Sequence, residues 1–236
     1  MNTKTTSLPT VSAVSAASAV RVWDLPTRLF HWALAACVIG LVISGNVGGN
    51  AMIWHFRFGY AVISLLLFRI VWGLIGGRWS RFASFIYSPR SLLAYLRGNG
   101  HPHHSVGHNP LGSGSVFALL AFLIAQVTSG MMSDDEIAFA GPMTKFVSNA
   151  TVSLATYYHK NVGKLVILVL VLLHLSAIAY YFFKKKENLV KPMVQGDKTL
   201  PANTPASQDN LQSRVVAAIV FALCVTFTLW LVKLGS

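Results

Sequence analysis

The sequence has few charged residues, few acidic residues and few cysteines. Charged residues make up 11% of its 236 residues, whereas a soluble domain carries about 25%. Seven acidic residues stand against 19 lysines and arginines, so the formal net charge is +12. The two cysteines, Cys37 and Cys224, lie in separate apolar stretches, which favours packing over a disulfide. The chain also lacks a glycine-rich phosphate loop, a nucleophile elbow and a His-Glu-x-x-His motif.

Apolar residues, by contrast, account for 54% of the chain and concentrate in five stretches. These stretches cover residues 29–48, 53–77, 115–132, 162–183 and 215–232. As helices they are long enough, or nearly so, to cross about 30 Å of hydrocarbon. They lack the strict alternation of a membrane barrel. The sequence therefore predicts an all-α integral membrane protein with five spans.

Basic residues divide unequally between the two sides of such a membrane protein. If the spans alternate, one side carries Arg21, Arg28, Arg78, Arg81, Arg90, Arg97, Lys184, Lys185, Lys186, Lys191, Lys198 and Arg214. The other side carries Arg57, Lys145, Lys160, Lys164 and Lys233, with the acidic run Asp134, Asp135 and Glu136. The positive-inside rule places the first side, with the N-terminus, in the cytoplasm and the C-terminus outside. In this topology the net positive charge is a membrane signal, and nothing indicates a nucleic-acid partner.

The segments outside the spans have their own expected roles. Residues 1–20 are rich in serine, threonine and alanine and are expected to be a disordered cytoplasmic tail. Ala17-Ser18-Ala19 resembles a signal-peptidase site, but serines and Pro9 break the run before it. Residues 187–214 are expected to form a cytoplasmic linker to a fifth span at 215–236. That span is expected to pack against other helices or to anchor the chain in the membrane. The long outer loop from 133 to 158 is an expected surface for an external partner.

Four histidines sit near the ends of the predicted spans. His159 and His174 are 15 residues apart on one span, which corresponds to roughly 22 Å along a helix, with both rings on the same broad side. By depth, His31 pairs with His174, and His55 pairs with His159. A polar ring in hydrocarbon is costly, so its default interpretation is functional. Two stacked pairs predict two bis-histidine haems, a ligation that suits electron transfer; an ordinary solvated histidine is the alternative for His55 and His159.

Three further residues are candidate contacts of the same cofactor. Gly59 and Gly163 each follow a histidine by four residues, which would leave room for a flat macrocycle beside the ring. Their alternative role is simply to let membrane helices approach. Arg69 lies within an apolar span, where its charge needs a partner. A propionate of the inner haem is the preferred partner, and a snorkelling arginine is the alternative.

Three alternatives to a b-type haem protein are weighed against the sequence: a metal site in a loop, a transporter and a c-type cytochrome. His101, His103, His104 and His108 cluster in one loop and could bind zinc or copper, but the loop offers no cysteine or carboxylate ligand. A histidine-containing transporter is disfavoured because no span is broken by proline and no span carries a carboxylate. A covalently attached c-type haem is excluded because the chain lacks a Cys-x-x-Cys-His motif.

Two motifs carry a resemblance to a known family. They are Val22-Trp-Asp-Leu-Pro-Thr-Arg-Leu-Phe-His-Trp32 and Gly107-His-Asn-Pro-Leu-Gly112, joined by His55 with Gly59 and by His159 and His174. The chain resembles bacterial cytochrome b561, grouped with the b-type cytochrome subunits of nickel–iron hydrogenases. The resemblance covers about residues 20–186 and implies a four-helix haem-binding domain at 21–186. It also implies that the first, second and fourth helices supply the ligands and that His108 belongs to a loop motif.

The resemblance extends to function. It implies a cytochrome of the bacterial inner membrane with two b-type haems, or one as in some members. Such a protein carries electrons between the quinone pool and a periplasmic redox partner such as a c-type cytochrome. The alternatives are a membrane-anchor subunit of a larger oxidoreductase, as in hydrogenases, and a superoxide:quinone oxidoreductase. The fifth span lies outside the four-helix domain.

Overall fold

A computed structural model describes residues 16–99 and 106–235, and within them five helices are long and apolar enough to cross a membrane. Helix α1 covers Leu25–Val47, α2 Met52–Ile75 after the short η1 (Gly49–Ala51), α4 Pro110–Met131, and α8 Leu211–Gly235. The fourth span is continuous through α5 (Asn149–Tyr157), η5 (Tyr158–Gly163) and α6 (Lys164–Phe183). The predicted all-α membrane fold with five spans is therefore confirmed.

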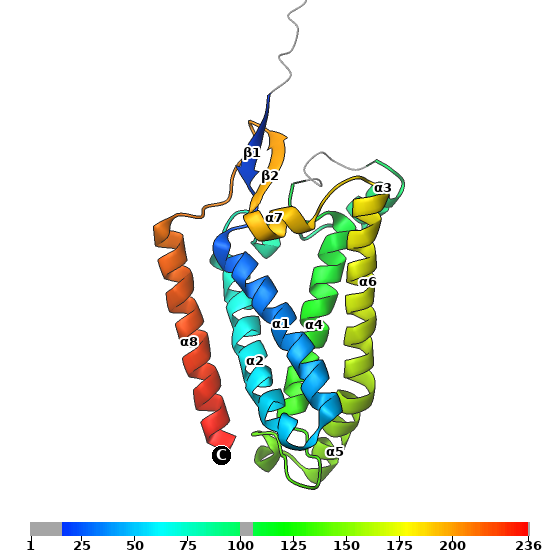
Figure 1. The fold of residues 1–236 in the computed structure, drawn as a ribbon, viewed down its shortest axis with the longest axis vertical. Coiled ribbons are helices and arrows are strands. Elements are labelled where there is room, and N and C mark those ends of the chain that lie inside the picture. Colours follow the sequence, from blue (N-terminus) through cyan, green and yellow to red (C-terminus); the bar gives the residue numbers. More distant parts are fainter. Residues whose placement is uncertain (1–15, 100–105, 236) are drawn as a thin grey trace, which may run out of the picture.

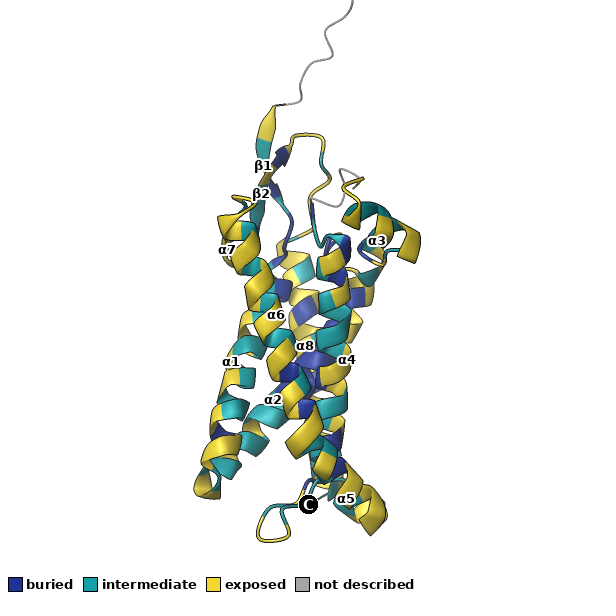
Figure 2. Ribbon diagram, turned by 90° about the vertical axis from the view of Figure 1, so that its right-hand side faces the viewer, coloured by how far each residue is buried: buried dark blue, intermediate teal, exposed yellow. Residues whose placement is uncertain are grey.

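Helices α1, α2, α4 and α6 form an elongated bundle, with α8 lying against α2 on the side away from α6 (Figure 1). The centre of the bundle is an apolar cluster of Val62, Leu66, Leu123 and Ile167. Exposed residues occur along the length of the helices (Figure 2), and many of them are large and apolar, such as Ile39, Leu172 and Leu229. A soluble monomer rarely exposes so much contiguous apolar surface, so this outer surface suits lipid.

The first motif of the sequence is the start of α1. The Asp24 carboxylate caps the helix by accepting a hydrogen bond from the backbone N–H of Thr27 at 2.8 Å. Pro26 occupies the first turn, where its missing N–H costs nothing. Asp24 also accepts bonds from Trp72 Nε1 at 3.1 Å and Ser80 Oγ at 2.7 Å. One fully buried carboxylate thus starts α1 and fixes it to the end of α2.

The second motif starts α4 in the same way. The Asn109 side chain accepts a hydrogen bond from the N–H of Gly112 at 2.8 Å, and Pro110 follows in the first turn. The Asn109 amide also donates to the Tyr181 hydroxyl at 2.7 Å, which connects α4 to α6. The Tyr181 hydroxyl lies 2.8 Å from that of Tyr95 in the short surface helix α3 (Pro89–Leu96).

A two-stranded sheet sits at the end of the bundle where α1 begins, hereafter the sheet end. Strand β1 (Ala17–Arg21) pairs antiparallel with β2 (Asp197–Pro201), with Ala17 opposite Pro201. Residues 17–20 were predicted to belong to a disordered tail, and that prediction was wrong. Their pairing is stabilised by an apolar cluster of Val20, Val22, Trp23, Trp79, Val106 and Leu200. The rest of the predicted tail, residues 1–15, lies outside the described residues.

The predicted linker 187–214 is also ordered. It contains helix α7 (Val190–Gln195), which accepts hydrogen bonds from Arg28 and Trp32 of α1 at two of its carbonyls, and strand β2. The remaining short turns are η2 (Phe82–Ser84) and η4 (Thr144–Phe146). The end of the bundle opposite the sheet is hereafter the α5 end.

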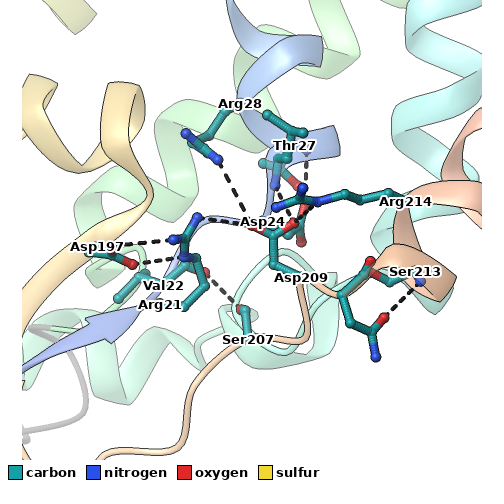
Figure 3. A network of polar contacts seen from close by, with 12 residues as sticks. Arg21, Val22, Asp24, Thr27, Arg28, Asp197, Ser207, Asp209, Ser213 and Arg214 are labelled. Atoms are coloured by element: carbon teal, nitrogen blue, oxygen red, sulfur yellow. Dashed lines mark hydrogen bonds and ion pairs between the residues drawn. The ribbon is translucent and has the colours of Figure 1, made fainter.

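Asp209 anchors the segment before α8 (Figure 3). It pairs with Arg21 and Arg214 at 2.9 Å each and with Arg28 at 3.9 Å, and it accepts a bond from the N–H of Leu25. Burial alone would raise the pKa of this carboxyl. The hydrogen bonds from Arg214 and Leu25 and the charges of Arg214 and Arg21 outweigh burial and hold the pKa below its usual value.

Helix α8 is attached to α2 inside the membrane as well. Ser64 of α2 donates to the Thr228 hydroxyl at 3.0 Å, and both side chains are buried. Ala217 and Cys224 of α8 pack on the cluster that contains Phe68 and Trp72. The fifth span therefore packs on the four-helix bundle, and Cys224 packs there without a disulfide.

Candidate functional site

The structure brings the four histidines together as two pairs. The ring centroids of His31 (α1) and His174 (α6) are 6.4 Å apart near the sheet end. Those of His55 (α2) and His159 (η5) are 6.0 Å apart near the α5 end. We call these the inner pair and the outer pair. The pairing that depth alone indicated is the pairing in space.

Both spacings fit two imidazoles bound to opposite sides of one iron. A metal–nitrogen bond is about 2 Å long, so two such rings place their centroids about 6 Å apart. Within the described residues, three or more His, Cys, Asp or Glu side chains nowhere gather as a metal site. The histidines thus meet two at a time, which is the number that a haem iron takes from a protein in bis-histidine ligation.

Backbone carbonyls orient both rings of the outer pair. His55 Nδ1 lies 3.1 Å from the carbonyl oxygen of Leu41, and His159 Nδ1 lies 2.9 Å from that of Gln126. A carbonyl oxygen only accepts, so each Nδ1 carries the proton and each Nε2 keeps its lone pair. Such second contacts fix the tautomer and the orientation of metal-ligating histidines. The outer pair is therefore prepared for metal binding.

Glycines on neighbouring helices make room for the outer rings. A Cβ at Gly45 of α1 would lie 3.0 Å from His55 Cε1, and a Cβ at Gly130 of α4 would lie 2.7 Å from His159 Cε1. Neither glycine was predicted from the sequence, because glycine is common in membrane helices and each contact is with a ring on another helix.

The two glycines that the sequence did indicate behave differently. A Cβ at Gly59 would meet nothing within 4 Å, so the predicted room exists there. At Gly163 the Gln126 side chain occupies that space, with Tyr158 Cε1 at 2.8 Å. Gly163 thus lets α4 approach the fourth span, as its alternative role proposed, and the prediction of open space beside it was wrong.

His159 lies in a π-helical turn, η5, between α5 and α6. Single π-turns inside membrane or soluble helices are rare and occur frequently at functional sites. Gln126 faces this turn and donates to the carbonyl oxygen of His159 at 3.0 Å. Periodicity in the sequence could not reveal the turn, because His159, Lys160 and Asn161 leave no apolar repeat in it whose spacing could be read.

Arg69 is buried near the sheet end, with 3% of its surface exposed. Its guanidinium lies 4.6 Å from the centre of the Phe82 ring, and its Nη1 is buried without a hydrogen-bond partner. A side chain in this position does not snorkel to the headgroups, so that alternative is wrong. A buried cationic donor without a partner indicates an anionic ligand group nearby.

His108, on the loop before α4, lies beside the inner pair. Its ring packs between Trp23 and Phe85, with centroid distances of 4.7 and 4.6 Å. Burial, together with the charges of Arg69, His174 and His31, lowers the pKa of His108 to about 3. The other three histidines of the predicted loop cluster, His101, His103 and His104, lie outside the described residues.

The acidic run of the outer loop is engaged in its own turn. The Asp135 carboxylate accepts hydrogen bonds from the backbone N–H groups of Ile137, Ala138 and Phe139. These bonds hold the pKa of Asp135 below its usual value. Asp134 accepts one from the N–H of Glu136 at 2.7 Å. The side chain of Ile137, in contrast, is 91% exposed at the tip.

Residues 22–196 match the family model of prokaryotic cytochrome b561, so the chain belongs to that family. It is a multi-pass membrane b-type cytochrome, a class whose activity is electron transfer. It is similar to the probable Ni/Fe-hydrogenase B-type cytochrome subunit of Rhodobacter capsulatus, at 24% identity over 77% of this chain and 82% of that protein.

Two other relatives carry similar names. The probable Ni/Fe-hydrogenase B-type cytochrome subunit of Rhizobium leguminosarum bv. viciae is 23% identical over 76% of this chain and 88% of that protein. The probable Ni/Fe-hydrogenase 1 B-type cytochrome subunit of Escherichia coli K12 is 24% identical over 46% of this chain and 57% of that protein. The family match ends at residue 196, so α8 lies beyond it.

Proposed function

We propose that this cytochrome holds two b-type haems, one at each histidine pair, and carries electrons across the bilayer between them. The observation that carries the proposal is the presence of two histidine pairs whose centroid spacings, 6.4 and 6.0 Å, both suit an iron between the rings. His31 and His174 would hold the inner haem, and His55 and His159 the outer one. Haem supplies reversible one-electron chemistry, and two histidine ligands leave the iron no position for oxygen.

The distance between the pairs supports a transmembrane path. His159 and His174 lie 15 residues apart on one span, which is roughly 22 Å of helix. The hydrocarbon core is about 30 Å thick, so the two pairs serve opposite halves of it. An electron that enters at one end can thus leave at the other.

The distribution of charged residues supports one orientation of the protein in the membrane. The sheet end carries most of the basic residues, including Arg78, Arg81, Arg90 and Arg97, and the α5 end carries the acidic run. By the positive-inside rule the sheet end is cytoplasmic and the α5 end, with the C-terminus, periplasmic in the bacterial inner membrane.

A cavity at the sheet end supports quinone as the electron-exchange partner there. It has a volume of about 330 Å³ and lies between the end of α2 and the start of α8. Trp72, Gln208, Gln212 and Ser213 line it, which combines an aromatic surface with donors for quinone carbonyls. Trp72 stacks on Phe68 at 5.7 Å, and Phe68 contacts Phe30, the neighbour of His31.

The rate of haem reduction by quinol tests whether the quinone binds in this cavity. Gln212→Leu is expected to raise the quinol KM severalfold, because the Gln212 side chain lines the cavity and the substitution removes a hydrogen-bond donor. The control is Thr226→Val, which lies about four turns further along α8 and does not line the cavity. Unchanged quinol kinetics in the leucine variant would place the quinone elsewhere.

The partner at the α5 end would be a periplasmic redox protein such as a c-type cytochrome. A second candidate function is that of a membrane-anchor subunit in a larger oxidoreductase, and the hydrogenase names of the relatives favour it. Affinity purification from the native membrane separates the two. A stoichiometric second subunit supports the anchor function, and isolation of the chain alone supports the independent carrier.

Haem content tests the central proposal. Pyridine haemochrome analysis of the purified protein is expected to give two b-type haems per chain, with a reduced-minus-oxidised spectrum of low-spin haem. One haem per chain would restrict the protein to a single site and remove transmembrane transfer within this chain. A haem-free protein would overturn the proposal.

A further inference from the structure

The proposed haem ligation by the inner and outer pairs gives no role to one buried nitrogen, Nδ1 of His108. Among the described residues, five buried side-chain atoms lack a hydrogen-bond partner: Arg28 Nε, His31 Nδ1, Arg69 Nη1, His108 Nδ1 and Gln126 Oε1. Three of them, on His31, Arg69 and His108, belong to side chains around the inner pair. Buried polar atoms are nearly always paired in native proteins, so such a cluster indicates a polar ligand.

These three side chains come from separate elements at the sheet end of the bundle. Arg69 is on α2, His31 on α1 and His108 on the loop before α4. A row of rings connects His108 to Arg69: the Phe85 ring lies 4.6 Å from that of His108, the Phe82 ring lies 5.9 Å from that of Phe85, and the Arg69 guanidinium lies 4.6 Å from the centre of the Phe82 ring. The loop itself is fixed, because the Tyr87 hydroxyl donates to the backbone carbonyl of His108 at 2.8 Å.

The surroundings of His108 decide what kind of group it can offer. With Trp23 and Phe85 against the ring and a cation nearby, the imidazole stays neutral and carries one N–H. A neutral N–H and the Arg69 cation together offer two donors to one acceptor. A carboxylate is the acceptor that such a combination suits best.

We propose that His108 is a haem-binding residue of the inner site, which donates a hydrogen bond from its ring to a haem propionate beside Arg69. This inference rests on the proposed inner haem at His31 and His174. It assigns to the Gly-His-Asn-Pro motif a second role besides starting α4. A purely packing role for the ring between Trp23 and Phe85 is the alternative.

The test uses the full chain with His159→Ala, so that only the inner site binds haem. His108→Phe keeps the ring between Trp23 and Phe85 and removes the donor, whereas His108→Gln keeps an N–H. His108→Leu accompanies them as a second variant without a donor. Each protein is titrated with haem b and with haem b dimethyl ester, whose side chains carry no carboxylate.

The phenylalanine and leucine variants are expected to bind haem b about tenfold more weakly than the parent, the usual effect of losing a hydrogen bond to a charged group. The glutamine variant should stay within about twofold. With the dimethyl ester the parent and all three variants should bind equally. The propionate bending band in the resonance Raman spectrum should shift in the phenylalanine variant and remain in place in the glutamine variant.

Two results would overturn the proposal. One is unchanged haem b affinity in both variants without a donor, and the other is an equal loss with haem b and its ester. Failure of the proposed function looks different, because the His159→Ala parent would then bind no haem before any change at His108. Folding is checked in the chain with all four histidines, where the outer haem must be retained.

Discussion

The inner and outer pairs each consist of two histidine rings but differ in what surrounds them. Backbone carbonyls of Leu41 and Gln126 orient the outer rings, and Gly45 and Gly130 make room for them. The inner pair instead lies among side chains that carry charge or polarity, notably Arg69 and His108. The outer site is thus built by the backbone, and the inner site by ionic and polar side chains.

Because of this difference, the two sites should respond to different kinds of substitution. Backbone carbonyls cannot be changed by substitution, so the outer haem should respond mainly to steric changes. A buried charge strongly shifts the midpoint potential of a nearby redox centre because the local dielectric constant is low. The inner haem should therefore respond mainly to changes of charge.

The largest expected effect is the loss of one haem when an axial histidine of either site is replaced. His174→Ala should remove the inner haem and His159→Ala the outer one, each lowering the content from two haems to one, because one axial ligand is lost. Both residues lie on the same span, so the variants are matched. Reduced-minus-oxidised spectra then give the midpoint potential of each remaining haem. Loss of both haems from either variant would show that the sites are not independent.

The next effect is steric and confined to the outer site. Gly130→Ala places a Cβ 2.7 Å from His159 Cε1, so the ring or the helix must shift. Overpacking of this kind costs about 1–3 kcal/mol, which corresponds to roughly a 5- to 150-fold loss of outer haem affinity. Gly114→Ala on the same helix is the control, because its Cβ meets nothing within 4 Å. Equal haem content in the two variants would contradict the steric account.

These expectations show which parts of the site a sequence can reveal. The pairing of the four histidines was predictable from their depths along the spans, and Arg69 was noticeable because a charged side chain inside an apolar span stands out in one dimension. Gly45 and Gly130 were not, because their contact is with a ring on another helix. His108 looked like part of a polar loop, since its burial depends on Trp23 and Phe85, which are distant in sequence.

The same reasoning applies to the fold. Long apolar stretches predicted five spans, since length and hydropathy are local properties. The β1–β2 sheet was missed because its two strands are about 180 residues apart in the chain and its serine- and alanine-rich first strand has weak β-propensity. Only the pairing and the cluster around Trp23 and Trp79 make it stable.

A smaller effect is electrostatic and confined to the inner site. Arg69→Gln removes a buried positive charge, which should disfavour the electron-rich reduced haem and lower the inner midpoint potential by roughly 60 mV, a factor of ten for one electron. Arg57→Gln at the α5 end is the matched control, because Arg57 is exposed above the Trp54 ring. Its shift should be much smaller, since water screens an exposed charge. Equal shifts in the two variants, measured by redox titration, would remove the distinction between the sites.

The smallest effect concerns attachment of α8 at the sheet end. Asp209→Asn removes the charge that Arg21 and Arg214 share, and should lower stability at pH 7 by about 1 kcal/mol, as expected for a small ion-pair network. Because the folded state lowers the pKa of Asp209, its contribution is present above the unfolded pKa of 3.8 and is lost as pH falls through the folded value. The difference in melting temperature between parent and variant should therefore shrink below about pH 4.

Asp135→Asn provides the comparison at the α5 end. Its three bonds come from backbone N–H groups, and an asparagine carbonyl can still accept them, so the variant should lose less stability than Asp209→Asn at pH 7. Neither substitution should change haem content, because neither carboxylate contacts a histidine of the inner or outer pair. Thermal unfolding in detergent, followed at pH 7 and at pH 3, measures both. A larger loss at Asp135 would mean that charge matters more at the α5 end than its backbone bonding indicates, and would reverse the contrast between the two ends.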